Sequence, residues 1–186
     1  MGAVLQFDFK DALTVINKVA AATGDTTPLL RDMGEYLIIA HLLRFDAQTS
    51  PDGTKWKALS PAYLKQKKKN KDKILTLDGY LKNTLRYQVA DGELLFGSNR
   101  AQAAILHFGG EIKKKERAAE VYFKQNKNGS VGRQFVKRKN SNFAQSVKIG
   151  AHVIKMPARP WLGTSPANNT ELMNIAVRHM ERIINS

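Results

Sequence analysis

The segment Thr27–Asp46, TPLLRDMGEYLIIAHLLRFD, decides the fold because it is the longest apolar stretch in this chain of 186 residues. Thr27 can cap a helix, and Pro28 suits the first helical position because it lacks a backbone N–H. Apolar residues then recur at the helical repeat, at Leu30, Met33, Leu37, Ala40 and Leu43. The pattern predicts a core helix that runs from Thr27 to about Asp46.

Further helices are predicted on both sides of this segment. Apolar spacing and capping residues place them at residues 8–23, after Ser60 and Pro61, at 78–83, at 101–108, and after Ser165 or Thr170. The helix at 101–108 should stop at Gly109 and Gly110, since glycine readily takes the left-handed conformation. The chain is therefore rich in helices, most of them short.

The clearest strand signal lies near the middle of the chain. Residues 84–89 alternate between apolar and polar, residues 90–93 supply an Asp-Gly turn, and residues 94–97 return. Together with the helices, this hairpin predicts an α+β fold. We expect a small antiparallel sheet packed against a long core helix and flanking helices, with a projecting basic β-hairpin arm.

The formal charge of +14 is concentrated in two places. Residues 55–73 contain eight lysines and one aspartate, a net of +7, and residues 113–139 contain ten Lys or Arg and two Glu, a net of +8. The remaining chain carries a net charge of −1. A balance of this kind indicates a polyanionic or acidic partner, a need for solubility, or both, and it limits the candidate contact regions to two segments.

Residues 111–150 are interpreted as the basic arm, with Asn128 and Gly129 at its tip and β-compatible pieces at 121–123 and 134–136. The two basic stretches at 113–117 and 133–139 would run along its two legs, with aromatic residues between them. Such a surface suits nucleic acid, because bases stack on aromatic rings between cations. It equally suits an acidic protein, and we favour protein contact.

Two other places hold candidate contact residues. The lysine run at 65–71 can clamp phosphates, or it can be a solvated helix end where cations complement the helix dipole. In the Pro-stiffened stretch at 157–163, we expect Trp161 and Leu162 in the core, while Arg159 is open to either role. The candidate partner-contacting residues are Lys67, Lys68, Lys69, Lys113, Lys114, Lys115, Arg117, Tyr122, Phe123, Arg133, Phe135, Lys137, Arg138, Lys139 and Arg159.

Signals for catalysis are lacking in the sequence. The four histidines are not at metal-ligand spacing, there is no cysteine, and no nucleophile or nucleotide-binding motif occurs. His107 attracts most interest, because its imidazole could orient a loop, but a packing role is the better reading. The N-terminus does not resemble a signal peptide, and no apolar run reaches the ~18 residues of a membrane span. We expect a cytoplasmic, soluble protein with no catalytic residue, metal, cofactor or small-molecule substrate.

Six motifs occur in an order that resembles the phage virion-morphogenesis or tail-completion family of Mu-like and P2-like phages. They are Pro51–Gly53 leading to Trp56, Leu59–Ala62, Ile74–Leu81, Phe96–Ser98, Ala103–Gly110 and Pro157–Gly163, followed by a terminal helix. The resemblance covers nearly the whole chain apart from the first helix and the arm. It implies one tail-completion-like domain over residues 1–186, in which the arm at 111–150 replaces a small loop.

The resemblance also implies a function and a set of partners. It implies a structural protein without catalysis that completes the tail and joins it to the head, in the neck or tail-terminator region. The expected partners are other copies of the chain in a ring, a hexamer being one candidate size, together with tail-tube, tail-terminator or head-connector proteins. Packaged DNA is a further candidate partner. The expected location is the virion, in the tail or neck, and the host cytoplasm during assembly.

Two other classes of function compete with this one. A basic nucleic-acid-binding module would use the lysine run and the arm to contact DNA. An enzyme, such as a nuclease or a peptidoglycan hydrolase, is disfavoured because no candidate active site is present.

Overall fold

The computed structural model describes residues 3–4, 21 and 25–185, so most of the helix expected at 8–23 lies outside the described residues. The chain forms two compact units. The first unit comprises residues 1–110 and 157–186, and the second comprises residues 111–156. The second unit therefore extends past residue 150, where the expected arm ends.

The first unit contains the long helix that the apolar pattern predicts. Helix α2 spans Thr27–Ala47, with Pro28 in its first turn. Its N-cap is Thr26 rather than the expected Thr27, whose backbone N–H donates to the carboxylate of Asp25 at 2.8 Å. The helix ends at Gln48, which takes the left-handed conformation and closes the last turn by donating its N–H to the carbonyl of Arg44.

A three-stranded antiparallel sheet packs on α2. The strands are β1 (Ala3–Val4), β2 (Leu85–Ala90) and β3 (Glu93–Ser98), in the order β1-β3-β2. Asp91 and Gly92, both with positive φ, form the turn that the Asp-Gly sequence predicts. Helix α2 approaches β2 closely, because a Cβ atom added at Gly34 would lie 2.5 Å from the ring of Tyr87.

The other helices of the first unit are α3 (Pro61–Gln66), α4 (Ala103–Phe108) and α5 (Pro166–Ile184). Ser60 caps α3 as predicted, and Ser165 forms a capping box with Asn168 at the start of α5. The prediction of a helix at 78–83 is wrong. The chain forms a single 3-10 turn at Lys82–Thr84 instead.

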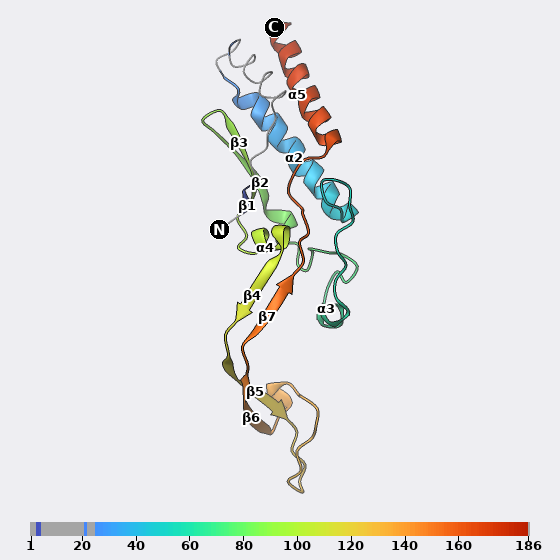
Figure 1. Ribbon diagram of the computed structural model, residues 1–186, viewed down its shortest axis with the longest axis vertical. Helices are drawn as coiled ribbons and strands as arrows, with labels where there is room; N and C mark the ends of the chain where they lie inside the picture. Colours follow the sequence, from blue (N-terminus) through green and yellow to red (C-terminus); the bar gives the residue numbers. More distant parts are fainter. Residues whose placement is uncertain (1–2, 5–20, 22–24, 186) are drawn as a thin grey trace. The chain divides into compact units, whose positions relative to one another are not determined.

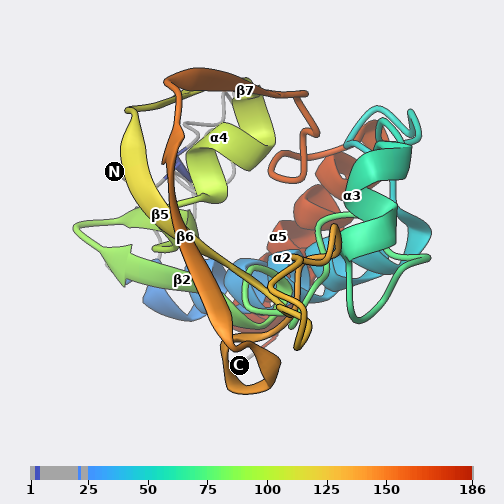
Figure 2. The same ribbon diagram turned by 90° about the horizontal axis from the view of Figure 1, so that it is seen from below.

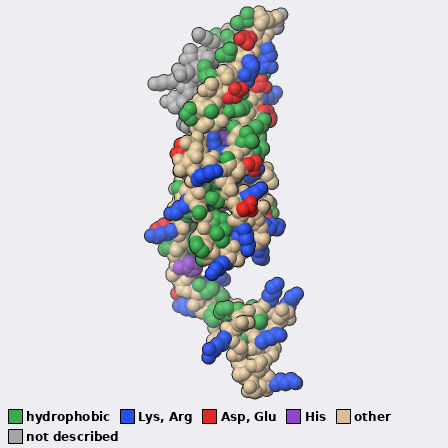
Figure 3. Space-filling view, turned by 90° about the vertical axis from the view of Figure 1, so that its right-hand side faces the viewer, with side chains coloured by type: hydrophobic (Ala, Val, Ile, Leu, Met, Phe, Trp, Pro, Cys, Tyr) green, Lys and Arg blue, Asp and Glu red, His purple; other side chains and the backbone are tan. Residues whose placement is uncertain are grey.

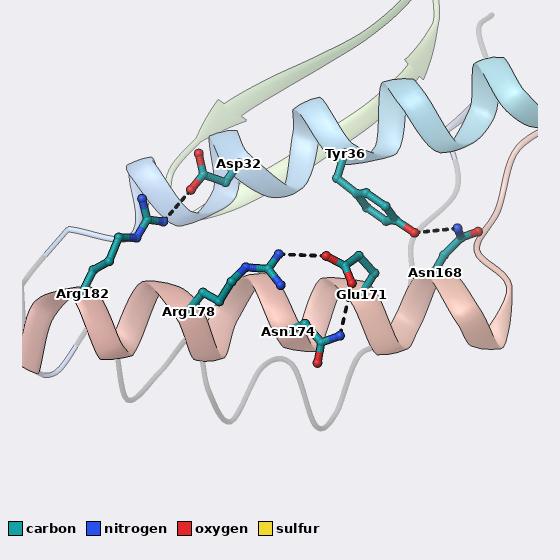
Figure 4. A network of polar contacts seen from close by, with 7 residues as sticks. All are labelled: Asp32, Tyr36, Asn168, Glu171, Asn174, Arg178 and Arg182. Carbon is teal, nitrogen blue, oxygen red and sulfur yellow. Dashed lines mark hydrogen bonds and ion pairs between the residues drawn. The ribbon is translucent and has the colours of Figure 1, made fainter.

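Helix α2 lies between the hairpin on one side and α5 on the other (Figures 1 and 2). Along the α2–α5 contact, Arg182 donates to Asp32 and the amide of Asn168 donates to the hydroxyl of Tyr36, both at 2.9 Å (Figure 4). Within α5, Glu171 accepts hydrogen bonds from Asn174 and Arg178. These contacts orient two helices whose apolar faces supply most of the packing.

Helices, strands and loops of the first unit all contribute residues to its core. Its buried apolar residues are Leu29, Leu30, Met33, Leu37, Phe45, Trp56, Leu81, Phe96, Ala103, Trp161, Leu162, Leu172, Ile175 and Ala176. One residue of the expected α2 stripe differs, since Leu43 is 64% exposed. The buried face of α2 instead continues through His41 and Arg44.

The second unit is built from two paired ribbons. The strands are β4 (Gly110–Lys114), which begins at the boundary of the unit, β5 (Arg117–Phe123), β6 (Phe143–Ile149) and β7 (His152–Met156). Strand β4 pairs with β7, and β5 pairs with β6. A turn closes at Asn126, Gly129 and Ser130, so the tip lies where Asn128-Gly129 predicts it. The prediction of a strand at 134–136 is wrong, because the strand that pairs with β5 spans residues 143–149.

Candidate interaction surfaces

The Pro157–Gly163 segment, called here the anchored loop, lies in the core of the first unit. Trp161 has no exposed surface and Leu162 is only 2% exposed, which confirms their predicted core positions. The indole N–H of Trp161 donates to the carbonyl of Ala103 in α4 at 3.2 Å. Its ring packs edge-on against His107, with centroids 5.9 Å apart. The loop therefore joins α4 to α2 and α5.

Two buried histidines accept hydrogen bonds from the backbone of the anchored loop. His107 of α4 accepts through Nδ1 from the N–H groups of Trp161 and Leu162, each at 3.3 Å. His41 of α2 accepts through Nε2 from the N–H of Gly163 at 3.3 Å. His107 therefore packs in the core, as expected, and its imidazole also orients the loop.

Both imidazoles must be neutral to accept these bonds. The Nδ1 of His41 lies 2.7 Å from the carbonyl of Leu37, so Nδ1 carries the proton and Nε2 is free to accept. Burial, and secondarily the charge of Arg44, lowers the pKa of His41 from 6.5 to about 3. Burial also lowers the pKa of His107. The loop is therefore held by two groups that acid would convert from acceptors to cations.

Arg44 of α2 binds the carbonyl groups of the same loop. Its Nη1 donates to the carbonyls of Trp161 and Gly163, at 3.2 and 2.7 Å, and its Nη2 donates to the side-chain oxygen of Asn168 at 2.9 Å. Because Asn168 belongs to the capping box of α5, one guanidinium connects α2, the loop and the start of α5. Burial lowers the pKa of Arg44, and the three acceptors compensate for part of its lost hydration.

Arg159, a candidate contact residue, is a structural residue in the described chain. It is 5% exposed, and its side chain donates to the carbonyls of Lys57 and Ala58 at 2.7 and 3.2 Å. The neighbouring Pro160 carbonyl accepts from the indole of Trp56 at 2.8 Å. Arg159 is therefore buried and holds the 57–58 segment through its Nε and Nη2, which favours the structural role over the contact role.

The candidate residues of the lysine run at 65–71 include one that is buried and two that are exposed. Lys67 is 4% exposed, and its ammonium group donates to the carbonyls of Asn70 and Lys73, so it closes a turn rather than facing a partner. Lys68 is exposed, and Lys69 forms a surface ion pair with Asp78 at 3.0 Å. Of the three candidates in this run, two are accessible.

The second unit holds the remaining candidates, and nearly all of them are accessible. Its exposed basic candidates are Lys113, Lys114, Lys115, Arg117, Arg133, Lys137, Arg138 and Lys139. Lys and Arg side chains protrude from the lower part of the space-filling view (Figure 3). Phe135 is 73% exposed and lies 5.1 Å from the half-buried ring of Phe123, centroid to centroid, while Tyr122 is half-buried.

The two basic stretches do not form the two legs of one hairpin, as the sequence led us to expect. Residues 113–117 belong to β4 and the start of β5, whereas residues 133–139 form a loop and a 3-10 turn before β6. This loop runs beside β5, where the N–H of Val136 donates to the carbonyl of Tyr122 at 2.8 Å. The loop and β6 therefore lie on opposite edges of β5.

The acidic side chains of the second unit are already engaged. Glu111 pairs with Lys155, Glu116 pairs with Lys148 at 3.1 Å, and the hydroxyl of Tyr122 donates to Glu120. None of the ten basic side chains of residues 113–139 forms an ion pair within the described part of the chain. The excess charge is thus free to face a partner.

Sequence reasoning missed His41 and Arg44 as anchors of the loop. A signal was present, because both fall on the helix face that Leu37 and Ala40 define, where a polar side chain must find a buried partner. The identity of that partner could not be read from the sequence, since the loop lies more than a hundred residues away along the chain.

An anchored scaffold with an exposed basic surface is typical of a protein that acts by contacting other molecules. Within residues 3–4, 21 and 25–185, no group of three metal-ligating side chains could hold a metal ion. No described helix is long and apolar enough to cross a membrane.

The comparisons with known proteins identify the family. A model of the phage virion morphogenesis family matches residues 7–181, so the chain belongs to that family. This confirms the resemblance drawn from the six motifs, and it gives the chain a structural or assembly role in the phage virion. No curated protein and no solved structure matches the chain.

Proposed function

We propose that the chain completes the phage tail and joins it to the head, as a non-enzymatic subunit of an oligomeric ring in the neck or tail-terminator region. Residues 1–186 act as one tail-completion domain into which the basic arm is inserted. The ring contains further copies of the chain, with a hexamer as one candidate size. Its other partners are tail-tube, tail-terminator or head-connector proteins, and packaged DNA where the ring faces it.

The contrast between the two units is the observation that carries this proposal. The first unit buries an extensive core, whereas the second presents a charged surface with no residue fully buried. Such a surface favours a role in contact with other molecules. In a closed ring of identical subunits, one surface of each subunit contacts a different surface of its neighbour.

Imaging particles made without this protein tests the tail-to-head role. We expect DNA-filled heads beside free tails, and normal joined particles would overturn the proposal. Analytical ultracentrifugation of the purified chain tests the ring, since a single closed oligomer is expected. A chain that is monomeric at all concentrations and never enters particles would also count against it.

A second candidate is a basic module that contacts DNA. The observation that favours it is that the second unit has ten basic side chains without an ion pair in the described chain and, in addition, the exposed ring of Phe135. Duplex binding should then weaken steeply with salt, by about 10³-fold or more between 50 and 200 mM if six or more phosphates are contacted. Weak binding with a shallow salt dependence would exclude this candidate.

A further inference from the structure

The second unit lacks a core of its own. None of residues 111–156 is buried, although Val121, Phe123, Phe143 and Val147 are half-buried on its β5–β6 ribbon. A two-stranded ribbon is at best marginally stable in water unless another strand or layer covers it. The half-buried apolar side chains of the ribbon are therefore ones that a strand or layer from a partner would cover.

The two edges of this ribbon differ. Beside the C-terminal end of β5, the N–H groups of Gly132 and Val136 donate to the carbonyls of Lys124 and Tyr122, both at 2.8 Å, so a loop covers that end of the outer edge. Strand β6 has β5 as its only neighbouring strand in the described chain. The chain itself covers the Tyr122 end of the β5 edge, whereas no strand of the described chain lies along the outer edge of β6.

The register shows which groups the open edge presents. Because the carbonyl of Tyr122 points to the covering loop, Tyr122 and its partner Ala144 form a non-hydrogen-bonded pair. Because hydrogen-bonded and non-hydrogen-bonded pairs alternate along an antiparallel ribbon, Ser146 and Lys148 also belong to non-hydrogen-bonded pairs. These three residues direct their backbone N–H and C=O groups away from β5, and all three are exposed.

Charge indicates what the open edge would take. The unit that carries this edge holds ten basic side chains without an ion pair in the described chain, whereas each of its three carboxylates is already engaged. An open hollow of about 420 Å³ lies on the β5–β6 ribbon, between the start of β5 and the second half of β6, and is lined by Glu116, Arg117, Ala118, Ser146, Val147 and Lys148. Arg117 has no ion pair in the described chain, so a carboxylate entering the hollow would meet an unpaired guanidinium.

We infer that the outer edge of β6 is a strand-addition site for an acidic, extended segment of a different virion protein. The segment continues the β5–β6 ladder through Ala144, Ser146 and Lys148, and its carboxylates face the basic side chains. A second copy of the same arm fits less well, because the two would repel each other. Duplex DNA fits the charge but has no backbone amide groups to extend a ladder.

Hydrogen exchange tests this inference, which rests on the proposed function for its setting. Exchange into the fragment Phe143–Ile149 is compared by mass spectrometry in the free protein and in isolated virions or tails. In the free protein only the amides bonded to β5 should be protected. In particles the fragment should gain protection at Ala144, Ser146 and Lys148, and equal exchange in the two states would overturn the inference.

A matched pair of substitutions isolates the edge. Ser146→Pro removes one outward N–H while leaving the bonds to β5, and Ser146→Ala retains that N–H. We expect Ser146→Pro to lower the yield of joined particles about tenfold or more and Ser146→Ala to leave it unchanged. Protection of Phe143 and Gln145 in the free variant checks that the ribbon still forms. A variant with that protection and a normal yield would contradict the inference.

Cross-linking within particles identifies the occupant. Cross-links from Lys148 to an acidic segment of another protein support the inference, whereas links only to a second copy of the arm, or to DNA, overturn it. If the chain is missing from virions and tails altogether, the proposed function fails instead. If the chain is present but β6 stays open, only this inference fails.

Discussion

The two units of this chain solve different physical problems. The first unit buries Trp161 completely and bonds both the N–H and the C=O groups of the anchored loop to side chains of α2 and α4. In the second unit even a phenylalanine, Phe135, is 73% exposed. Because burial of apolar surface is the main source of stability, the difference teaches that the first unit carries the stable core, whereas the second leaves most of its surface exposed.

Truncating one aromatic residue in each unit should give the largest contrast. Trp161→Ala empties the centre of the core and removes the donor to Ala103, so we expect a loss of ~3–5 kcal/mol in the free energy of unfolding. That is a large part of the 5–15 kcal/mol typical of a domain of roughly this size. Urea denaturation followed by circular dichroism measures it.

Phe135→Ala is the matched control in the second unit. It removes an exposed ring that touches Phe123, so the change should be about 0.5 kcal/mol or less. Comparable losses in the two variants would contradict the division of roles between the units.

Acid should act on the first unit through its histidines. The pKa of His41 falls from 6.5 to about 3 on folding, so the unfolded chain binds more protons below pH 6.5. Stability is then fully present above pH 6.5 and declines as the pH falls, by about 2 kcal/mol from His41 alone between pH 7 and 5. His107, whose pKa is also lowered, adds to the decline.

Denaturation at pH 7, 6 and 5 measures this slope. The His41→Gln variant provides the control, since it removes one of the two protons from the slope whatever its effect on absolute stability. A wild-type free energy of unfolding that is flat over this range would show that the imidazoles are not held neutral in the folded protein.

Packing between α2 and β2 should give a smaller effect. Gly34→Ala normally stabilises a helix by about 1 kcal/mol, but here the added methyl group would lie 2.5 Å from the ring of Tyr87. Overpacking of this kind costs ~1–3 kcal/mol, so a net loss of about 1 kcal/mol is expected. Chemical denaturation measures it, and the same substitution in a Tyr87→Leu background should be neutral or stabilising. A gain in the wild-type background would mean that the ring moves aside freely.

The parts of the fold that follow from local chemistry could be predicted from the sequence. Pro28 begins α2, Ser60 caps α3 and Asp91-Gly92 turns the hairpin, because each acts on residues within a few positions of itself. The partner of β5 was placed at 134–136 rather than 143–149 because both segments follow the same turn and contain apolar residues. The choice between them depends on pairing across the ribbon, which local propensity does not determine.

The candidate surface was predicted less well, for a related reason. Lys67 and Arg159 have the residue types of an interface, but both are buried and donate to backbone carbonyls, Lys67 within its own turn and Arg159 to the distant 57–58 segment. Neither kind of side-chain hydrogen bond to a backbone carbonyl leaves a periodic pattern in the sequence. The basic residues of the second unit are exposed, as the lack of core periodicity in their spacing predicts, and their contact with a partner stays a prediction.

Removing the second unit should have the smallest effect on the stability of the first. We expect a chain with Glu111–Met156 replaced by a short Gly-Ser linker to keep the core, the anchored loop and its acid sensitivity, because the residues that build them all lie in the first unit. Its free energy of unfolding should change by no more than about 0.5 kcal/mol. The same chain should fail to support particle assembly in complementation assays. If the deletion unfolds the first unit, the second contributes to the fold after all, and its exposed surface would then have to be explained by intramolecular contacts rather than by a partner.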